Sequence, residues 1–292
     1  MKHRAWILSL AAGMALATAV PAQSPIVDAG LLVEQEHAFA AMAKSQGIRA
    51  AFMEWMAPTG VVFSPGPVIG RKSYEARPAT PARLEWDPDH AVMSASGDMG
   101  WTTGPWTYRR DSTDLQPIAY GQFVTVWRKQ PDGSWRASID AGIGHAPPSI
   151  GMTEPSLRTL PAMPAGWRKP LAERKSLWQT DAEFVKVARA EGPAAALLKY
   201  AAFDVVVLRD GAQRWIGVTA VDSIAAREPK VDMMSTAQFM SQAGDLGYTY
   251  GTYVAPREAD ADSGHYVHIW ERDPSRVWKL ALEVVLPLPK RR

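Results

Sequence analysis

The stretch Ser96-Gly97-Asp98-Met99-Gly100-Trp101-Thr102-Thr103-Gly104 recurs 147 residues later as Ala243-Gly244-Asp245-Leu246-Gly247-Tyr248-Thr249-Tyr250-Gly251. Both copies keep Gly, Asp, Gly, Thr and Gly at the same spacing, and methionine and tryptophan are replaced by leucine and tyrosine, which are also large. A motif repeated at this distance indicates that the chain contains one domain twice.

Other pairs of residues extend the repeat on both sides of this motif. Phe39 corresponds to Phe184, 145 residues later, and Trp127 corresponds to Trp270, 143 residues later. We therefore predict a first domain over 23–146 and a second domain over 171–289. A proline-rich linker is expected over 147–170 and a basic tail over 290–292.

Both halves show the same predicted order of elements, with helices first and a long antiparallel meander last. Helices are expected over 26–46, 48–56 and 70–76, and again over 171–190, 194–202 and 220–226. Strands are expected over 61–63, 84–95, 99–109, 118–129 and 135–142, and again over 204–208, 231–242, 246–255, 264–272 and 277–286. Gly97-Asp98 lies between two of these strands, which predicts a type II′ hairpin turn with Asp98 and Asp245 as turn formers.

The first 22 residues have the parts of a secretory signal peptide. Lys2 and Arg4 precede an apolar run over 5–20, and the run ends at the small-residue exit Val20-Pro21-Ala22. A membrane anchor is the alternative, but the run is short for a bilayer span. We predict cleavage near Ala22 and a periplasmic or secreted protein with no membrane span in its mature chain.

Composition excludes several classes of function. The net charge of +2 includes Lys2 and Arg4, so the mature chain is neutral and nucleic acid is not an expected partner. There is no cysteine, no phosphate-binding loop and no Gly-x-Ser-x-Gly motif, which disfavours nucleotide chemistry and covalent serine or thiol hydrolysis. We expect no cofactor.

Three stretches resemble the nuclear transport factor 2-like superfamily, especially its SnoaL-like branch of exported bacterial proteins. They are Glu36-His37-Ala38-Phe39-Ala40, the motif from Ser96 to Gly104, and Phe123-Val124-Thr125-Val126-Trp127-Arg128. The resemblance implies α+β halves, as two tandem cone-shaped barrels, each a curved antiparallel sheet wrapped on about three helices around an apolar cavity. Such cavities serve isomerases, dehydratases, cyclases and epoxide hydrolases, and also binding and assembly domains. Because these domains commonly pair through their sheets, we expect a monomeric intramolecular pseudo-dimer.

The last two strands of each half carry the candidate catalytic residues. If Gln130 lies opposite Trp135, then Thr125 and Asp140 share a face with Phe123 and Trp127. In the second half the same register, with Arg272 opposite Val277, gathers His268 and Glu283 with Tyr266 and Trp270. A shift of one residue would exchange the faces.

A carboxylate among aromatic rings has a raised pKa and can act as a general acid or base. Asp140 and Glu283 are the candidates, and His268 could pair with Glu283. A structural salt bridge or an exposed rim position is the alternative for each of them.

Aromatic side chains are the candidate ligand-binding residues, although core and interface positions are the alternative for most of them. They are Trp55, Trp86, Trp101, Phe123, Trp127, Tyr200, Tyr248, Tyr250, Tyr266 and Trp270. His265 and His268 have the look of a metal pair, but residues three apart on a strand face opposite sides, so we predict no metal site.

These observations lead to three hypotheses. The first is an exported tandem protein that binds a small, largely apolar ligand or an envelope partner without catalysis. The second is a cofactor-independent lyase, isomerase or hydrolase that uses a cavity carboxylate. The third is a scaffold for an envelope partner.

Overall fold

The structure is a computed structural model that describes residues 27–148, 156–161, 170–217, 221, 229–255 and 262–289. The predicted signal peptide over 1–22 and the basic tail over 290–292 lie outside the described residues. The helix expected over 220–226 lies outside them too, except for residue 221.

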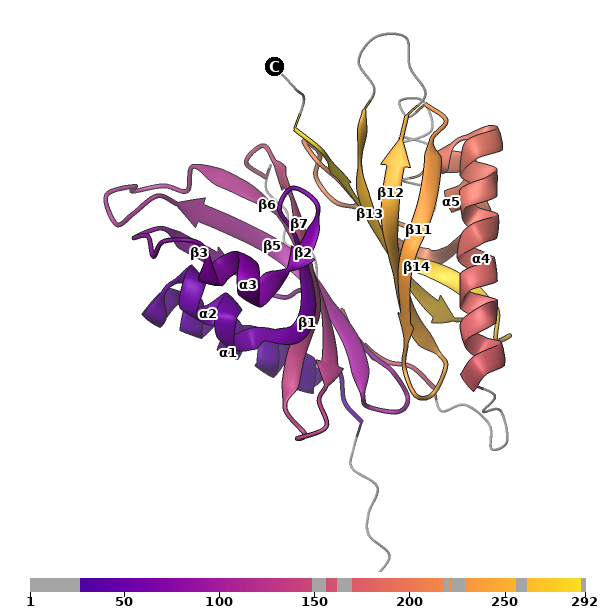
Figure 1. The fold of residues 1–292 in the computed structure, drawn as a ribbon, viewed down its shortest axis with the longest axis horizontal. Helices are drawn as coiled ribbons and strands as arrows, with labels where there is room; N and C mark the ends of the chain where they lie inside the picture. Colours follow the sequence, from indigo (N-terminus) through magenta and orange to yellow (C-terminus); the bar gives the residue numbers. More distant parts are fainter. Residues whose placement is uncertain are drawn as a thin grey trace, which may run out of the picture.

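The first half consists of helices on one face of a curved sheet (Figure 1). Its helices are α1 (Gly30–Gln46), α2 (Ile48–Trp55) and α3 (Gly70–Glu75). Its strands are β1 (Met56–Phe63), β2 (Pro67–Ile69), β3 (Arg83–Trp86), β4 (His90–Met93), β5 (Met99–Arg109), β6 (Ala119–Lys129) and β7 (Trp135–His145). The sheet order is β2-β1-β7-β6-β5-β4-β8, where β8 (Ser156–Thr159) comes from the segment between the halves, and β3 also pairs with β5.

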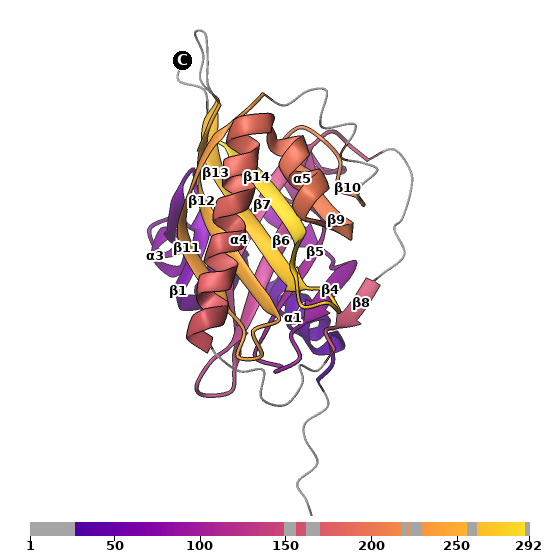
Figure 2. The same cartoon turned by 90° about the vertical axis from the view of Figure 1, so that its right-hand side faces the viewer.

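The second half repeats this arrangement, with α4 and α5 in front of its sheet in Figure 2. Its helices are α4 (Pro170–Glu191) and α5 (Pro193–Tyr200). Its strands are β9 (Ala201–Arg209), β10 (Trp215–Ile216), β11 (Asp232–Met240), β12 (Leu246–Val254), β13 (Ser263–Arg272) and β14 (Trp278–Pro287), in the order β10-β9-β14-β13-β12-β11. The predicted α+β class, with a sheet and its helices in each half, is confirmed.

In both halves a glycine ends the first helix, and another glycine on the sheet leaves room for that helix to pack closely. Gly47 and Gly192 have φ of 88° and 105°, a backbone conformation that stops α1 and α4 and that other residues adopt rarely. A Cβ at Gly247 would lie 2.6 Å from Leu177 Cδ2, and one at Gly100 would overlap Leu32. Both sheets therefore use a missing side chain to bring a leucine of the helix close.

A β-bulge in the last hairpin of each half sets which residues face the helices. Lys129, rather than Gln130, lies opposite Trp135, so the predicted register is wrong by one residue at the turn. The bulge beside Trp127 then restores the expected pairing, with Thr125 opposite Asp140. In the second half Arg272 lies opposite Trp278 rather than Val277, so this predicted register is wrong too, and the bulge beside Trp270 leaves His268 opposite Glu283.

The two sheets pack against each other through the faces that their helices leave open (Figure 1). One apolar cluster joins residues of both sheets, among them Trp101, Val126, Tyr248 and Ile269. Each sheet also has one separate apolar cluster between it and its own helices. The chain thus has two half-cores and one shared core between them.

The repeated motif fastens the halves to each other. Asp245 Oδ2 accepts a hydrogen bond from the backbone N–H of Ala95 at 2.7 Å, and Asp98 Oδ2 accepts one from Gln242 at 3.1 Å. Ala95 and Gln242 are equivalent in the repeat, so the two contacts are related by a pseudo-twofold axis. We call these contacts the hairpin clasp.

The hairpins do not have the predicted type II′ turn. Gly97 N–H donates to Ser94 O at 2.9 Å, and Gly97, with φ of 62°, is the fourth residue of the turn rather than its first central one. In the second half, Gly244 N–H donates to Ser241 O at 3.1 Å, and Gly244 is again the fourth residue of the turn. The aspartates lie beyond the turn, where their carboxylates reach the other half.

The segment between the halves contains β8 (Ser156–Thr159), which pairs in parallel with β4. No sequence pattern indicated this strand. Among the described residues, no helix has the length and apolarity that a membrane crossing requires.

Candidate functional site

Each half buries a carboxylate on the sheet-facing side of its first helix. Glu36 of α1 accepts hydrogen bonds from Thr102 Oγ1 at 2.5 Å and Trp127 Nε1 at 2.9 Å. Glu36 lies between Leu32 and Phe39, at helical spacing, so its side chain must point into the apolar core.

Asp181 occupies the same place in α4. It accepts hydrogen bonds from Thr249 Oγ1 at 2.6 Å and Trp270 Nε1 at 3.3 Å. The acid, the threonine and the tryptophan are thus all duplicated. Sequence analysis did not identify Glu36 or Asp181 as site residues, although an acid on the apolar face of a helix in both copies was a usable signal.

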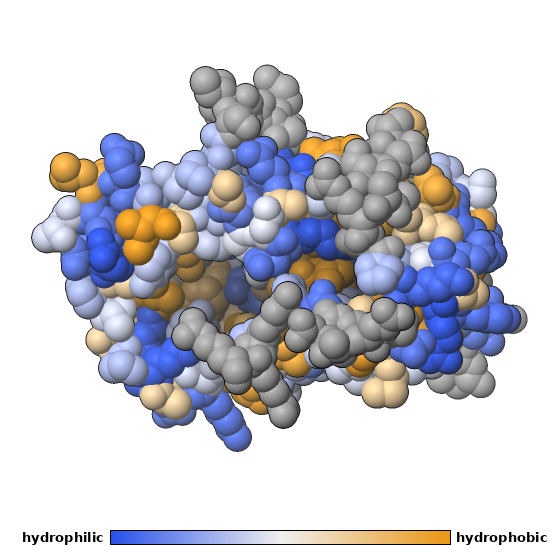
Figure 3. Space-filling view, turned by 90° about the horizontal axis from the view of Figure 1, so that it is seen from above, coloured by the Kyte–Doolittle hydropathy of each residue, from blue (hydrophilic) through white to orange (hydrophobic). Residues whose placement is uncertain are grey.

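The first half contains a pocket of about 210 Å³ between its helices and its sheet. We call it the first-half pocket, and it is lined by Phe52, Tyr74, Leu84, Trp86, Trp106, Phe123, Asp140, Ala141 and Gly142. The face seen from above in Figure 3 is hollowed, with apolar atoms inside the hollows and hydrophilic atoms around them. Aromatic rings around one carboxyl group are suited to a small, largely apolar ligand.

The Asp140 carboxyl in this pocket favours its neutral form. Burial and the nearby charge of Glu36 raise the pKa of Asp140 to about 8, against a hydrogen bond from Thr125 Oγ1 at 3.3 Å that lowers it. Burial also raises the pKa of Glu36. Among the residues that the structure describes, no cation compensates either group, so protonation is the way to reduce the cost of burying two carboxyls together.

The second half compensates its equivalent carboxylates with cations. His268, in place of Thr125, lies 2.8 Å from Asp181 Oδ1 through Nδ1 and 3.0 Å from Glu283 Oε1 through Nε2. Arg209 donates to the other oxygen of Glu283. These four residues form a buried chain of alternating charge.

The pKa values of this chain follow from its pairing. Burial alone would raise the pKa of Glu283, but the charges of Arg209 and His268 outweigh it and lower the pKa to about 2. Burial would lower the pKa of His268, but its hydrogen bonds to Asp181 and Glu283 raise it to about 8. Glu283 is therefore ionised and His268 largely protonated at neutral pH.

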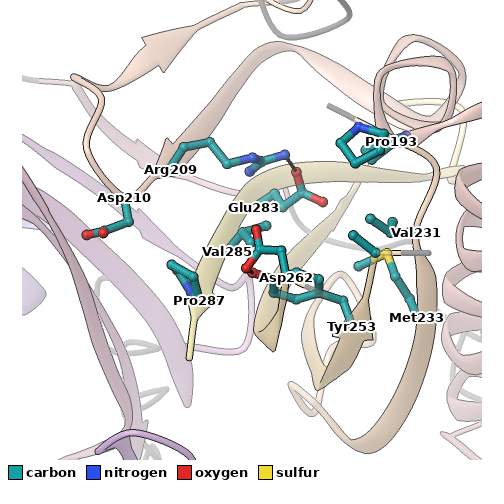
Figure 4. A pocket seen from close by; sticks show the side chains of 12 residues that line it. Pro193, Arg209, Asp210, Val231, Met233, Tyr253, Asp262, Glu283, Val285 and Pro287 are labelled. Carbon is teal, nitrogen blue, oxygen red and sulfur yellow. Dashed lines mark hydrogen bonds and ion pairs between the residues drawn. The ribbon is translucent and has the colours of Figure 1, made fainter. Parts of the chain in front are cut away.

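A second pocket of about 210 Å³ opens beside this chain. We call it the second-half pocket, and Figure 4 shows Arg209 joined to Glu283 on one wall, with Met233 and Tyr253 nearby. Asp210, Asp262 and Pro287 also line it. Its carboxylate Glu283 is already held by Arg209 and His268, whereas Asp140 in the first-half pocket lacks such partners among the described residues.

The structure separates the predicted aromatic residues into three groups. Trp86 and Phe123 line the first-half pocket. Trp101, Tyr248 and Tyr250 pack in the core between the two sheets, the alternative expected for them, and they line neither the first-half pocket nor the pocket beside Glu283. The remaining five pack in the half-cores: Trp55, Trp127, Tyr200, Tyr266 and Trp270.

Among the pocket residues that sequence analysis did not identify are Phe52, Tyr74 and Leu84. Phe52 and Tyr74 stack with ring centroids 4.2 Å apart, and they come from α2 and α3, whose mutual placement no local pattern gives. His265 and His268 do lie on opposite sides of β13, because His265 contacts Phe63 of the first half while His268 is buried in the second.

No family model matches this chain, and no curated protein matches it. Solved structures of nuclear transport factor 2-like proteins are similar to about two fifths of it. One, of unknown function from Shewanella oneidensis MR-1, has 9% identity and a TM-score of 0.33 over 38% of this chain and 97% of that chain.

Two further structures have similar values. An NTF2-like protein with a cystatin-like fold from Novosphingobium aromaticivorans has 14% identity and a TM-score of 0.32 over 40% of this chain and 83% of that chain. LinA has 13% identity and a TM-score of 0.34 over 41% of this chain and 88% of that chain. These similarities do not identify the chemistry of this chain.

Proposed function

We propose that the protein binds a small, largely apolar molecule with a hydrogen-bonding group in its first-half pocket. The observation that carries the proposal is the Asp140 carboxyl, which faces an aromatic pocket with no cation among its described lining residues and has a pKa raised to about 8. A neutral carboxyl can donate one hydrogen bond and accept another. It therefore suits a hydroxyl or carbonyl group on an otherwise apolar ligand.

The size of the pocket limits the ligand. An apolar cavity of about 150 Å³ accommodates benzene, and the first-half pocket has about 210 Å³. A flat molecule of one or two rings fits this volume. Trp86 and Trp106 supply faces on which such a ring can stack.

Isothermal titration calorimetry with β-naphthol tests the binding proposal. We expect saturable binding to the full chain, unchanged in Asp140→Asn, which stays neutral and polar. Asp140→Leu should bind about fivefold more weakly, since one hydrogen bond contributes about 1 kcal/mol.

Filling one pocket at a time identifies the site. Leu84→Trp fills the first-half pocket and should abolish binding, while Val231→Phe, in the second-half pocket, should leave it intact. Loss of binding in Val231→Phe alone would contradict the proposal.

Acid–base catalysis is the second candidate function. Asp140 lines the pocket and accepts a hydrogen bond from Thr125, and the buried Glu36 behind it also has a raised pKa. A group with a pKa near the working pH is an efficient general acid or base. Asp140 would then serve a cofactor-independent lyase, isomerase or hydrolase.

Asp140→Asn separates the two functions. In the catalytic case it abolishes turnover while ligand binding persists, and the rate of the wild type changes near pH 8. In the binding case no turnover of bound ligands is detected in either protein.

Export is a further part of the proposal and rests on the sequence of residues 1–22. Expression of the full chain in a bacterium should yield a periplasmic or secreted protein that begins at Gln23. Intact-mass analysis of the purified protein measures this, and a protein that retains Met1 to Ala22 in the cytoplasmic fraction would contradict it.

A further inference from the structure

The two sheets end differently at equivalent edges. Met93 of β4 lies opposite Gly100, and Met240 of β11 lies opposite Gly247, so β4 corresponds to residues 237–240 of β11. The outer edge of β4 carries β8. Within the described ranges, no strand pairs with the outer edge of β11.

The way in which β8 binds to β4 defines what such an edge accepts. Ser156 N–H donates to Asp89 O and Leu160 N–H donates to Met93 O, both at 2.8 Å. Arg158 lies opposite Val92 and forms an ion pair of 2.7 Å with the buried Glu271 of the second half. The extended β8 segment is thus held by backbone hydrogen bonds and by one ion pair of its arginine.

The charge at the equivalent place of the other edge is reversed. Arg128 corresponds to Glu271 in the repeat, and Phe239 corresponds to Val92. The guanidinium carbon of Arg128 lies 3.3 Å from the centroid of the Phe239 ring. The described part of the chain gives Arg128 no carboxylate at ion-pair distance, and burial lowers the pKa of its guanidinium.

Two further features mark this edge as incomplete. The side-chain oxygen of Gln238 is buried and has no hydrogen-bond partner within the described ranges. Met234 of the same strand is 63% exposed. Exposed strand edges are templates for the addition of another strand.

We propose that residues 237–240 of β11 bind an extended acidic segment of a partner protein, which adds as a parallel strand and places a carboxylate opposite Phe239, in contact with Arg128. The chain's own β8 segment does not suit this edge, because Arg158 would meet Arg128. The partner strand is therefore the charge-reversed counterpart of β8.

A pair of labelled peptides tests the proposal on the full chain. One has the sequence of residues 155–161, and the other has the same sequence with Arg158→Glu. By fluorescence anisotropy we expect the acidic peptide to bind at least about tenfold more tightly than the parent. Arg128→Glu in the protein should reverse this preference, and Arg128→Gln should abolish it, which gives a second variant if the first fails to fold.

The backbone of the edge is tested separately. By correspondence with Ala91, the N–H of Gln238 points outward, so Gln238→Pro should weaken binding of the acidic peptide about tenfold while Gln238→Ala preserves it. Equal binding of both peptides, binding unaffected by Gln238→Pro, or no binding of either peptide would overturn the proposal. A stable dimer that buries this edge in solution would also overturn it, because a second copy would then be the occupant.

Discussion

Asp140 and Glu283 occupy equivalent positions on the last strand of each half, yet their carboxyl groups have opposite tendencies to ionise. Glu283 is flanked by Arg209 and His268, while Asp140 has Thr125 and the acid Glu36 as neighbours. The residue opposite the acid on the preceding strand, Thr125 or His268, is therefore the position at which the two pockets diverge.

The pH dependence of stability should report the state of Asp140. A carboxyl whose pKa is raised from about 4 to about 8 on folding favours the folded state below pH 4, and this advantage is lost as the pH rises through 8. Asp140→Asn stays neutral at every pH. In urea denaturation, the free energy of unfolding should fall between pH 5 and pH 9 by more in the wild type than in Asp140→Asn. The difference should be at least about 1.4 kcal/mol, the equivalent of one pKa unit. Parallel curves for the two proteins would refute this assignment.

Substitution of His268 should strongly lower the stability of the second half. His268→Asn leaves Asp181 and Glu283 without the cation between them, and removing one partner of a buried ion pair costs about 3–5 kcal/mol. The pKa of His268 rises from 6.5 to about 8 on folding, so its contribution is complete below pH 6.5 and is lost as the pH passes 8.

His37 provides the matched control for this prediction. It also contacts a carboxylate, Asp87 at 2.7 Å, but both side chains are more than half exposed. His37→Gln should change the free energy of unfolding by less than about 1 kcal/mol. If the two histidine variants prove equally stable in urea denaturation, the buried chain does not support the second half.

At the scale of elements, the hairpin clasp makes the repeated motif a device for pairing the halves. Asp98→Ala and Asp245→Ala each remove an acceptor for a backbone N–H of the other half. We expect a loss of about 1–3 kcal/mol in urea denaturation. Asp245→Ala should cost more, because Asp245 is buried whereas Asp98 is only partly buried.

A turn-forming role would give a different result. Asn is a good turn former, so Asp245→Asn would then be neutral. In the hairpin clasp, by contrast, the NH₂ group of an asparagine at 245 would face the N–H of Ala95, and two donors would meet. Only a flipped amide, with its oxygen toward Ala95, would keep the hydrogen bond. Stability unchanged in both alanine variants would contradict the clasp.

Local patterns predicted the elements well because apolar spacing and glycines act within a few residues. Gly47 and Gly192, for example, end α1 and α4 where the sequence indicated. The bulge beside Trp127, the strand β8 and the outward reach of Asp98 could not be predicted, since each depends on a partner far along the chain. The register error at Gln130 and the bulge offset each other, which is why Asp140 still shares a face with Thr125.

The same limit applied to the candidate site. Asp140 could be proposed from strand alternation, and Trp86 and Phe123 from their aromatic character. Which aromatic residues line the pocket depends on the face on which the second sheet packs, and Trp101 and Tyr248 belong to that shared core. Arg209, which neutralises Glu283, comes from β9 and was recognisable only in three dimensions.

At the scale of the whole molecule, the shared core resembles the interface of a dimer whose two copies have diverged. Trp101 donates to Glu271 at 3.0 Å on one side of the pseudo-twofold axis, whereas Arg128 covers Phe239 on the other. Because the equivalent contacts differ, each half is complementary to the other half and not to a second copy of itself. We expect the mature protein to be a monomer in light scattering after size exclusion, and a stable dimer would contradict this expectation.

We propose that the two equivalent carboxyls have different roles, a neutral one at Asp140 that binds a ligand and an ionised one at Glu283 that stabilises the fold. Titration of the side-chain carboxyl carbons of Asp140 and Glu283 by ¹³C NMR tests this most directly. We expect that the Asp140 resonance titrates near pH 8 and shifts on addition of β-naphthol, while Glu283 stays ionised down to about pH 2. Titration of Asp140 near pH 4, with no response to β-naphthol, would contradict it.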